Sequence, residues 1–263
     1  SFGYPSFYDV NIALVSETNL TVGSLGLGLR ANQATNQGDD PFVYNSLLYR
    51  LKTQGWIEKI AYSVYTSELN GTGGGIFFGG LYHDLYKGNV LYTLPLVNVD
   101  PELDEPARFH ITLQNLTTSI NGTNSSVLSE KYPALLSTGS MFTYLPEELF
   151  DSFVDEMDLE KGAKHKDLYV IPCDTNATFI YDFGGFEIET PLSGYTFKVE
   201  SNRTADDMCA VMVKPHNKSY LTLGNGFFAA TYVLFNLEDL EISMAPASGI
   251  EYLDAFDYEY IEG

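Results

Sequence analysis

Short segments in which apolar and polar residues alternate recur along this chain, and they limit it to folds built mainly from strands. The clearest examples are residues 7–15, 60–69, 75–80, 89–99 and 108–116. Each segment is bounded by Gly, Pro, Asn or Asp, which is typical of strands separated by turns. The 19 Tyr and 17 Phe residues agree with this pattern, because aromatic side chains favour strands. We therefore predict an all-β fold.

Two segments follow a helical period instead. In residues 44–55, leucines recur at helical spacing and a glycine ends the pattern. In residues 146–157, Pro146 and two acids precede an apolar face formed by Leu149, Phe150, Phe153 and Met157. We expect a few short helices among the strands. Residues 115–126 are polar, and we expect them to form an exposed loop.

The charge balance excludes some classes of partner. The 14 Lys and Arg residues face 35 Asp and Glu residues, which gives a net charge of −21. Nucleic acid and anionic membranes need a basic surface, so neither is expected as a partner. Cationic partners fit better, and the alternative is that the charge only keeps the surface soluble. No run of 18 apolar residues occurs, so we expect no direct membrane span.

Acceptor sequences for N-glycosylation indicate passage through the secretory pathway. N-x-S/T occurs eight times, at Asn19, Asn70, Asn115, Asn121, Asn124, Asn176, Asn202 and Asn217. We expect these residues in surface loops of a secreted or cell-surface glycoprotein. The sequence opens at Ser1 without Met or a signal peptide, which suggests a processed chain. A GPI anchor on a further segment is one way to hold such a protein at the surface.

The two cysteines suit an oxidising compartment. Cys173 and Cys209 make an even count, so we predict one disulfide between them, and the alternative is two buried thiols. They are not spaced as zinc ligands, and neither are the histidines, so no metal is expected. The histidines are His83, His110, His165 and His216.

One stretch, PALLSTGSMFTYLP at residues 133–146, places Ser137, Thr138, Gly139 and Ser140 directly after an apolar run. A serine nucleophile would need a positioned base, and the four histidines lie in unrelated contexts without a G-x-S-x-G motif. Elsewhere, YLTLGNGFF at residues 220–228 and GSLGLGL at residues 23–29 share an apolar residue followed by glycine.

These stretches, with residues 51–69, 75–98, 179–188 and 232–245 in the same order, resemble the pepsin-like aspartic proteases and most of all the fungal yapsins. The resemblance implies a bilobed all-β fold with a cleft between the lobes, and it places Cys173 and Cys209 at the second-lobe disulfide. It also implies that one Asp from each lobe shares a proton across a nucleophilic water, with no cofactor.

The chain departs from this family pattern at three places. Ser137 stands where the second Asp is expected, and a hydroxyl has a pKa too high for it to act as general base. No Asp-Thr-Gly or Asp-Ser-Gly occurs for the first lobe. Asn225 follows Leu-Gly where the family often has Asp. Phe142 and Tyr144, beside the motif, are expected to line substrate pockets, although at least one of them would enter the core.

From these differences we expect an incomplete first lobe. A polar segment with two prolines, residues 97–110, suggests the lobe boundary. We divide the chain into residues 1–98, the remainder of the N-terminal lobe plus an interlobe strand, residues 99–247, the C-terminal lobe, and residues 248–263, an acidic tail leaving the domain. The expected partner is a missing N-terminal fragment or subunit of the same protein.

The functional expectation is the peptide-binding chain of a yapsin-like secreted aspartic endopeptidase, catalytically inactive as written because both catalytic Asp residues are absent. The alternative is a natural pseudoprotease that acts as an extracellular binding or inhibitory glycoprotein. Whether Ser137 is natural or engineered separates these two hypotheses. The ligand would be a peptide or protein, and the acidic balance suggests basic residues in it.

Overall fold

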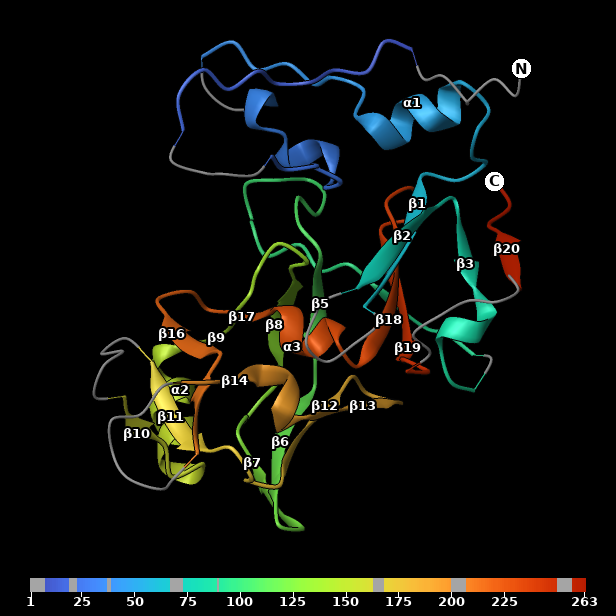
Figure 1. The fold of residues 1–263 in the computed structure, drawn as a ribbon. Coiled ribbons are helices and arrows are strands. Elements are labelled where there is room, and N and C mark those ends of the chain that lie inside the picture. The colour runs from blue at the N-terminus through green and yellow to red at the C-terminus, as the bar shows by residue number, and fades with distance from the viewer. Residues whose placement is uncertain are drawn as a thin grey trace.

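The computed structural model describes residues 8–18, 23–36, 39–66, 73–88, 90–162, 168–199, 207–249 and 257–263. Strands dominate these residues, and the helices are few and short. The prediction of an all-β fold is therefore confirmed. Figure 1 shows the chain before β1 as a layer at the top of the molecule, above the sheets.

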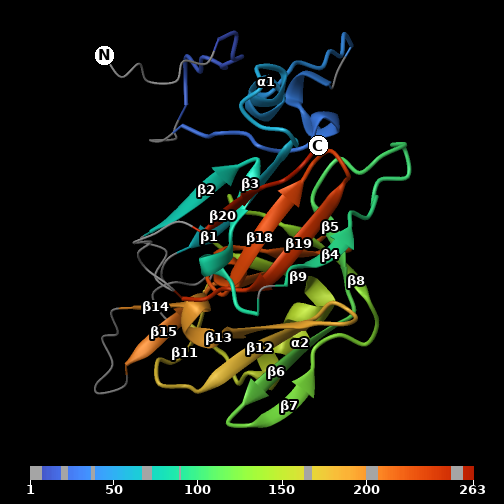
Figure 2. The same cartoon turned by 90° about the vertical axis from the view of Figure 1, so that its right-hand side faces the viewer.

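The first sheet joins strands from distant parts of the sequence. Its antiparallel order is β2-β1-β18-β19-β4, so two late strands lie between early ones (Figure 2). All six residues of β18 are buried, as expected for a central strand that is covered on both faces. The bounds are Ala61–Thr66 for β1, Gly74–Phe78 for β2, Tyr92–Pro95 for β4, Thr231–Asn236 for β18 and Glu241–Pro246 for β19.

The second sheet has the order β16-β9-β17-β8-β5 and contains parallel as well as antiparallel pairs. Strand β17 runs parallel to β8, and β16 runs parallel to β9. The bounds are His110–Leu113 for β5, Tyr132–Leu136 for β8, Thr143–Pro146 for β9, Val213–His216 for β16 and Leu221–Leu223 for β17. This sheet carries the segments that the sequence singled out.

Two four-stranded antiparallel sheets and a two-stranded pair complete the fold. The orders are β13-β12-β6-β7, β10-β11-β15-β14 and β20-β3. The bounds are β3 Gly80–Tyr82, β6 Asn115–Ile120, β7 Thr123–Ser126, β10 Glu160–Lys161, β11 Tyr169–Pro172, β12 Ala177–Asp182, β13 Glu187–Pro191, β14 Thr196–Lys198, β15 Met208–Val211 and β20 Tyr258–Tyr260.

Both predicted helices are present. Helix α1, Leu47–Thr53, buries two leucines and ends before Gly55, whose φ of 74° suits the residue after a helix. Helix α2, Glu147–Glu156, follows Pro146 and has two acids in its first turn, where they favour the helix dipole. It buries Leu149, Phe150 and Phe153, as the spacing predicts. Helix α3, Asn225–Phe228, and four 3-10 helices, Arg30–Asn32, Ala34–Asn36, His83–Leu85 and Leu192–Tyr195, are shorter.

The N-terminal layer is joined to the sheets by packing and by charge. Leu48 and Leu51 of α1 belong to the same buried cluster as Phe235 of β18. The ammonium of Lys52 lies 2.7 Å from the carboxylate of Glu238 in the turn after β18. This half-exposed salt bridge lowers the pKa of the Glu238 carboxyl through its hydrogen bond to the lysine. Among the helices that the structure describes, none is long and apolar enough to span a bilayer.

Three expectations about elements were wrong. Residues 8–15 form no strand, and Ile12 and Leu14 are 86% and 97% exposed, because alternation supplies no neighbouring strand. Residues 115–126 form the β6–β7 hairpin rather than a loop. Asn121 and Gly122 take left-handed φ values of 50° and 82° at its turn, the geometry that an Asn-Gly pair favours.

The third concerns the acidic tail, which we expected to leave the domain. Of residues 248–263 the structure describes 248–249 and 257–263, and β20 in the latter segment pairs with β3. The Tyr258 and Tyr260 rings lie against Phe77, so aromatic packing outweighs the polar composition. The proposed lobe boundary falls in the stretch between β4 and β5, which contains no strand.

Candidate functional site

The Ser137 loop, residues 137–142 between β8 and β9, lies directly beside the Leu223-Gly224 segment. Because β8 and β17 are parallel, Leu136 stands opposite Leu223 at the ends of the two strands. The backbone N–H of Ser137 donates to the carbonyl of Leu223 at 3.0 Å. The tertiary structure thus brings together two motifs that are more than eighty residues apart in the sequence.

Further hydrogen bonds fix the loop in place. The N–H of Ser140 donates to the Ser137 carbonyl at 3.2 Å, and the N–H of Asn225 donates to the Ser140 carbonyl at 2.9 Å. The hydroxyl of Ser140 donates to the Phe142 carbonyl at 2.7 Å. On the other side, the N–H of Gly224 donates to the hydroxyl of Thr143 at 3.3 Å. The backbone around Ser137 is therefore held on both sides.

The side chains at the loop face solvent to different degrees. Ser137 is half-buried, whereas Thr138 and Gly139 are exposed. The described residues give the Ser137 hydroxyl no hydrogen-bond partner, and no histidine among them bonds to it. Such an alcohol can hold a water molecule by a hydrogen bond, but it cannot serve as a general base at ordinary pH. Asn225 begins α3 with its side chain exposed.

Gly224 allows the close approach of the two segments. A Cβ atom at this position would lie 2.3 Å from the Phe142 carbonyl oxygen and 2.7 Å from that of Ser140. Both oxygens belong to the backbone of the Ser137 loop, so they cannot move aside without displacing it. Glycine at position 224 is thus required by the packing of this site.

We expect Gly224→Ala to lower the free energy of unfolding by about 1 to 3 kcal/mol, the usual cost of overpacking. Urea unfolding measures this change. The control is Gly139→Ala, because a Cβ at position 139 meets no atom within 4 Å. The control should stay within about 0.5 kcal/mol of the unmodified protein. Equal effects of the two substitutions would contradict the role given to Gly224.

The same motif in the N-terminal part is built differently. Residues 23–29 form no strand, Leu25 is 62% exposed, and a 3-10 helix follows at Arg30. The strand β17 has β8 and β9 as neighbours, whereas residues 23–29 have no paired strand among the described residues. The likeness of the two short motifs therefore does not extend to their structure.

An aromatic row crosses the second sheet beside the Ser137 loop. It consists of His110, Tyr220, His216, Tyr144 and Phe142, whose successive ring centroids lie between 4.6 and 6.2 Å apart. The expectation that Phe142 or Tyr144 enters the core was wrong, because both are half-exposed. In the alternation of β9 the other two side chains, at positions 143 and 145, are the buried ones.

Both histidines of the row are neutral over most of the pH range. Burial, together with the nearby charge of Arg108, lowers the pKa of His110 to about 4. Burial also lowers the pKa of His216, whose Nε2 lies 2.6 Å from the carbonyl oxygen of Tyr220. The sequence did not single out this row, because its members come from four strands and a loop.

The disulfide prediction is confirmed, since Cys173 and Cys209 are bonded. Of the eight glycosylation sequences, five lie in described residues. Asn121, Asn124, Asn176 and Asn217 are exposed, but Asn124 lies on a strand rather than in a loop. Asn115 is half-buried in β6, and its carbonyl oxygen accepts a hydrogen bond from Ser126. Asn19, Asn70, Asn202 and also His165 lie outside the described residues.

No group of three or more potential metal ligands occurs among the residues that the structure describes. The donors that do lie together, such as His83 and Glu259, form an ion-pair contact with 3.2 Å between nitrogen and oxygen. This contact is far along the fold from the Ser137 loop, next to β3 and β20.

Comparison with known proteins agrees with this arrangement. The model of the family described as eukaryotic aspartyl protease matches residues 8–247. Aspartic proteinase MKC7 of Saccharomyces cerevisiae is 32% identical, covering 98% of this chain and 45% of the relative. Aspartic proteinase yapsin-3 of the same yeast is also 32% identical, over 90% of this chain and 48% of the relative.

A third relative, secreted aspartic protease 9 of Candida albicans, is 27% identical over 91% of this chain and 44% of its own length. The chain thus spans about half the length of these curated relatives. The family match covers most of the chain, and it includes both the Ser137 loop and the Leu223-Gly224 segment. The chain therefore belongs to the pepsin-like aspartic proteases and is similar to the yapsins of yeast.

Proposed function

We propose that this chain is the peptide-binding part of a yapsin-like aspartic endopeptidase and that, as written, it does not hydrolyse peptides. The observation that carries the proposal is the Ser137 loop. Its backbone is held by Leu223 and Asn225, yet the side chain at the position of the catalytic acid is an alcohol. An alcohol there removes one carboxylate of a dyad that must share a proton.

The proposed partner is a fragment or subunit of the same protein that supplies the other lobe and its Asp-Thr-Gly loop. Apolar residues of the N-terminal layer support this, because Ile12 and Leu14 are almost fully exposed. The peptide or protein ligand would reach the aromatic row beside the Ser137 loop. The net charge of −21 favours basic residues elsewhere in that ligand.

We place the protein outside the cell or at its surface, as a disulfide-bonded glycoprotein. The Cys173–Cys209 bond supports an oxidising compartment, and the exposed Asn121, Asn124, Asn176 and Asn217 suit glycan attachment. A relative that is named a secreted aspartic protease supports the same placement. Attachment through a GPI anchor is part of this proposal and would need a further segment.

A mixture of peptides from digested proteins tests the proposed function. The protein, with any chain that copurifies, is incubated with the mixture at acidic pH, and mass spectrometry follows both cleavage and hydrogen exchange. We expect no cleavage above the buffer control, together with slower exchange in residues 137–143 and 223–225 because bound peptide shields them. Efficient turnover would contradict the proposed inactivity. Unchanged exchange at these residues would contradict peptide binding.

A natural pseudoprotease that binds or inhibits other proteins is the second candidate. It is favoured by Asn225, which replaces another acid, and by the exposed Met141, which stands where the family usually has small hydroxyl residues. Several changes around one site are expected when selection for catalysis has ended. A single engineered substitution would leave the neighbouring positions unaltered.

A further inference from the structure

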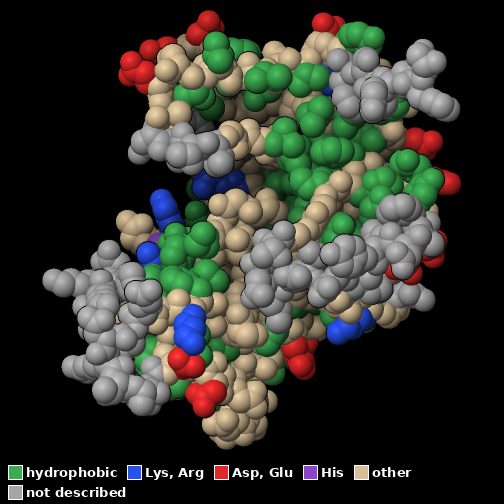
Figure 3. Space-filling model, in the orientation of Figure 1, with side chains coloured by type: hydrophobic (Ala, Val, Ile, Leu, Met, Phe, Trp, Pro, Cys, Tyr) green, Lys and Arg blue, Asp and Glu red, His purple; other side chains and the backbone are tan. Residues whose placement is uncertain are grey.

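A pocket opens between the N-terminal layer and the second sheet, and no part of the proposed catalytic loop lines it. Its volume is about 470 Å³, within the range of small-molecule sites. One wall comes from the 3-10 helices at residues 30–36, another from residues 97–103, and the floor from the second sheet and the loop before β17. Figure 3 shows a hollow at this level, with Lys and Arg side chains gathered beside it.

The floor of the pocket holds a polar side chain without a partner. His110 lines the pocket although only 1% of its surface is exposed. Its Nε2 atom is buried and makes no hydrogen bond to any described residue. A buried polar atom without a partner is costly, and its usual explanation is a group that has yet to bind.

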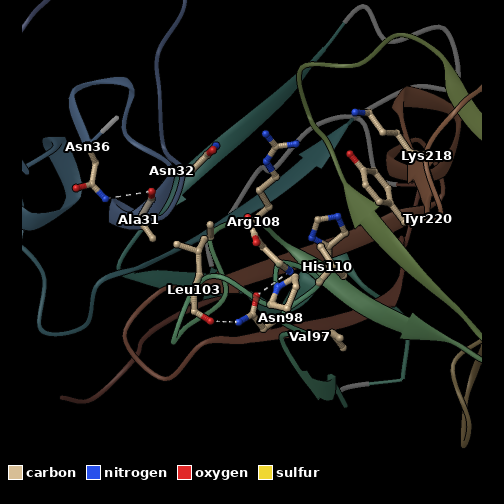
Figure 4. A pocket seen from close by; sticks show the side chains of 14 residues that line it. Ala31, Asn32, Asn36, Val97, Asn98, Leu103, Arg108, His110, Lys218 and Tyr220 are labelled. Carbon is tan, nitrogen blue, oxygen red and sulfur yellow. Dashed lines mark hydrogen bonds between the residues drawn. The ribbon is translucent and has the colours of Figure 1, made fainter. Parts of the chain in front are cut away.

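Two cations line the same pocket. Arg108 and Lys218 are exposed, and neither forms an ion pair with a described residue. This is unusual in a chain with 35 acidic and 14 basic side chains, where acidic partners are plentiful. Figure 4 shows Arg108, Lys218 and the hydroxyl end of Tyr220 around the ring of His110.

The acidic lining of the pocket is limited. Asp100 is the one carboxylate that lines it among the described residues, and its Oδ1 already accepts the N–H of Glu102 at 3.1 Å. The pocket thus holds two unpaired cations, one engaged carboxylate and one unsatisfied imidazole. This set of groups suits an anion rather than a cation.

The aromatic row connects this pocket to the Ser137 loop. His110 and Tyr220 line the pocket, and the row continues from them through His216 and Tyr144 to Phe142 beside the loop. A peptide that lies along the row would therefore bring one of its side chains to the pocket.

We propose that this pocket binds the carboxylate of an Asp or Glu side chain in the bound peptide, through Arg108, Lys218 and His110. The inference rests on the proposed peptide binding and adds a preference for one acidic position. It does not conflict with the attraction of basic residues by the net charge. Overall charge acts at long range, whereas the pocket acts on a single side chain in contact.

Competing peptide libraries test this inference in the protein as it is isolated, with any chain that accompanies it. Acetylated and amidated pentapeptides with random flanking residues and a central Asp, Asn or Lys are mixed with the protein. Gel filtration separates the bound fraction, and mass spectrometry measures it. We expect the Asp library to be retained at least about tenfold over the Asn and Lys libraries, as charge-assisted hydrogen bonds imply.

Variants locate the effect. Arg108→Gln and Lys218→Gln should each remove most of the preference for Asp, and both residues are exposed, so folding should be unaffected. The matched control is Lys87→Gln, which makes the same change of charge at an exposed residue outside the pocket. Arg108→Lys keeps the charge and should retain part of the preference.

Each other outcome overturns the inference in a distinguishable way. Equal retention of the three libraries would refute the pocket preference and leave peptide binding intact. No retention of any library would refute the proposed function and the inference together. Loss of the Asp preference in the presence of inorganic phosphate, but not of acetate, would show a phosphate site instead of a carboxylate site.

Discussion

Ser137→Asp is expected to produce hydrolysis of peptides once the first-lobe acid is supplied. The Ser137 loop already has its backbone held by Leu223 and Asn225, so an acid at this position would enter a formed site. Two carboxylates can then share a proton across a water molecule. General acid–base catalysis by one group contributes about 10²- to 10⁴-fold, and we expect a gain in kcat/KM of at least that order.

The measurement uses the chain co-expressed with a first lobe taken from a relative, such as yapsin-3 of S. cerevisiae, and follows cleavage of a fluorogenic peptide at acidic pH. The matched control is Ser137→Asn, which has nearly the shape of Asp but no titratable proton. Cleavage should appear with Asp alone and be blocked by pepstatin. A folded Ser137→Asp protein that stays inactive would favour the natural pseudoprotease over a protease with one altered residue.

Removal of the disulfide is expected to have the largest effect on stability. Cys173 and Cys209 are 36 residues apart in sequence, and this loop includes β12, β13 and β14. The chain-entropy model gives about 4 kcal/mol for closing a loop of this length. The double substitution Cys173→Ser and Cys209→Ser should therefore lower the free energy of unfolding by about that amount, measured by urea unfolding.

Reduction supplies the control for this prediction. Dithiothreitol should destabilise the unmodified protein to the level of the double variant and leave the variant itself unchanged. The strands on either side remain paired in both cases, because Ile171 of β11 still stands opposite residue 209 of β15. A change in unfolding free energy below about 1 kcal/mol would show that the bond contributes little beyond the sheet itself.

The location of Gly224 shows how far the motif by itself could be interpreted. Its sequence suggested a segment that packs beside the Ser137 loop, and the family resemblance gave the reason. The distances of 2.3 and 2.7 Å from a Cβ to two backbone oxygens could not be obtained from the sequence. They depend on the parallel register of β8 and β17, which joins residues far apart in the chain.

The anion pocket could not be predicted from the sequence at all. Arg108, His110 and Lys218 have no common spacing, and each is ordinary in its own stretch of sequence. Only the packing of the N-terminal layer over the second sheet places them around one volume. Nor does the sequence indicate that the Nε2 of His110 is left without a partner, because hydrogen bonding depends on the whole environment.

What the sequence determined by itself is local or carried by the family resemblance: most of the strands, the two helices α1 and α2, the one disulfide and the absence of an acid at position 137. These features follow from side-chain periodicity, turn residues and chemical identity, which act over a few neighbouring residues. Only the tertiary structure decided that residues 8–15 form no strand, that residues 115–126 form a hairpin and that Tyr258 pairs against β3. The physical reason is that a strand is stable only with a neighbouring strand and a buried face, and both come from distant parts of the chain.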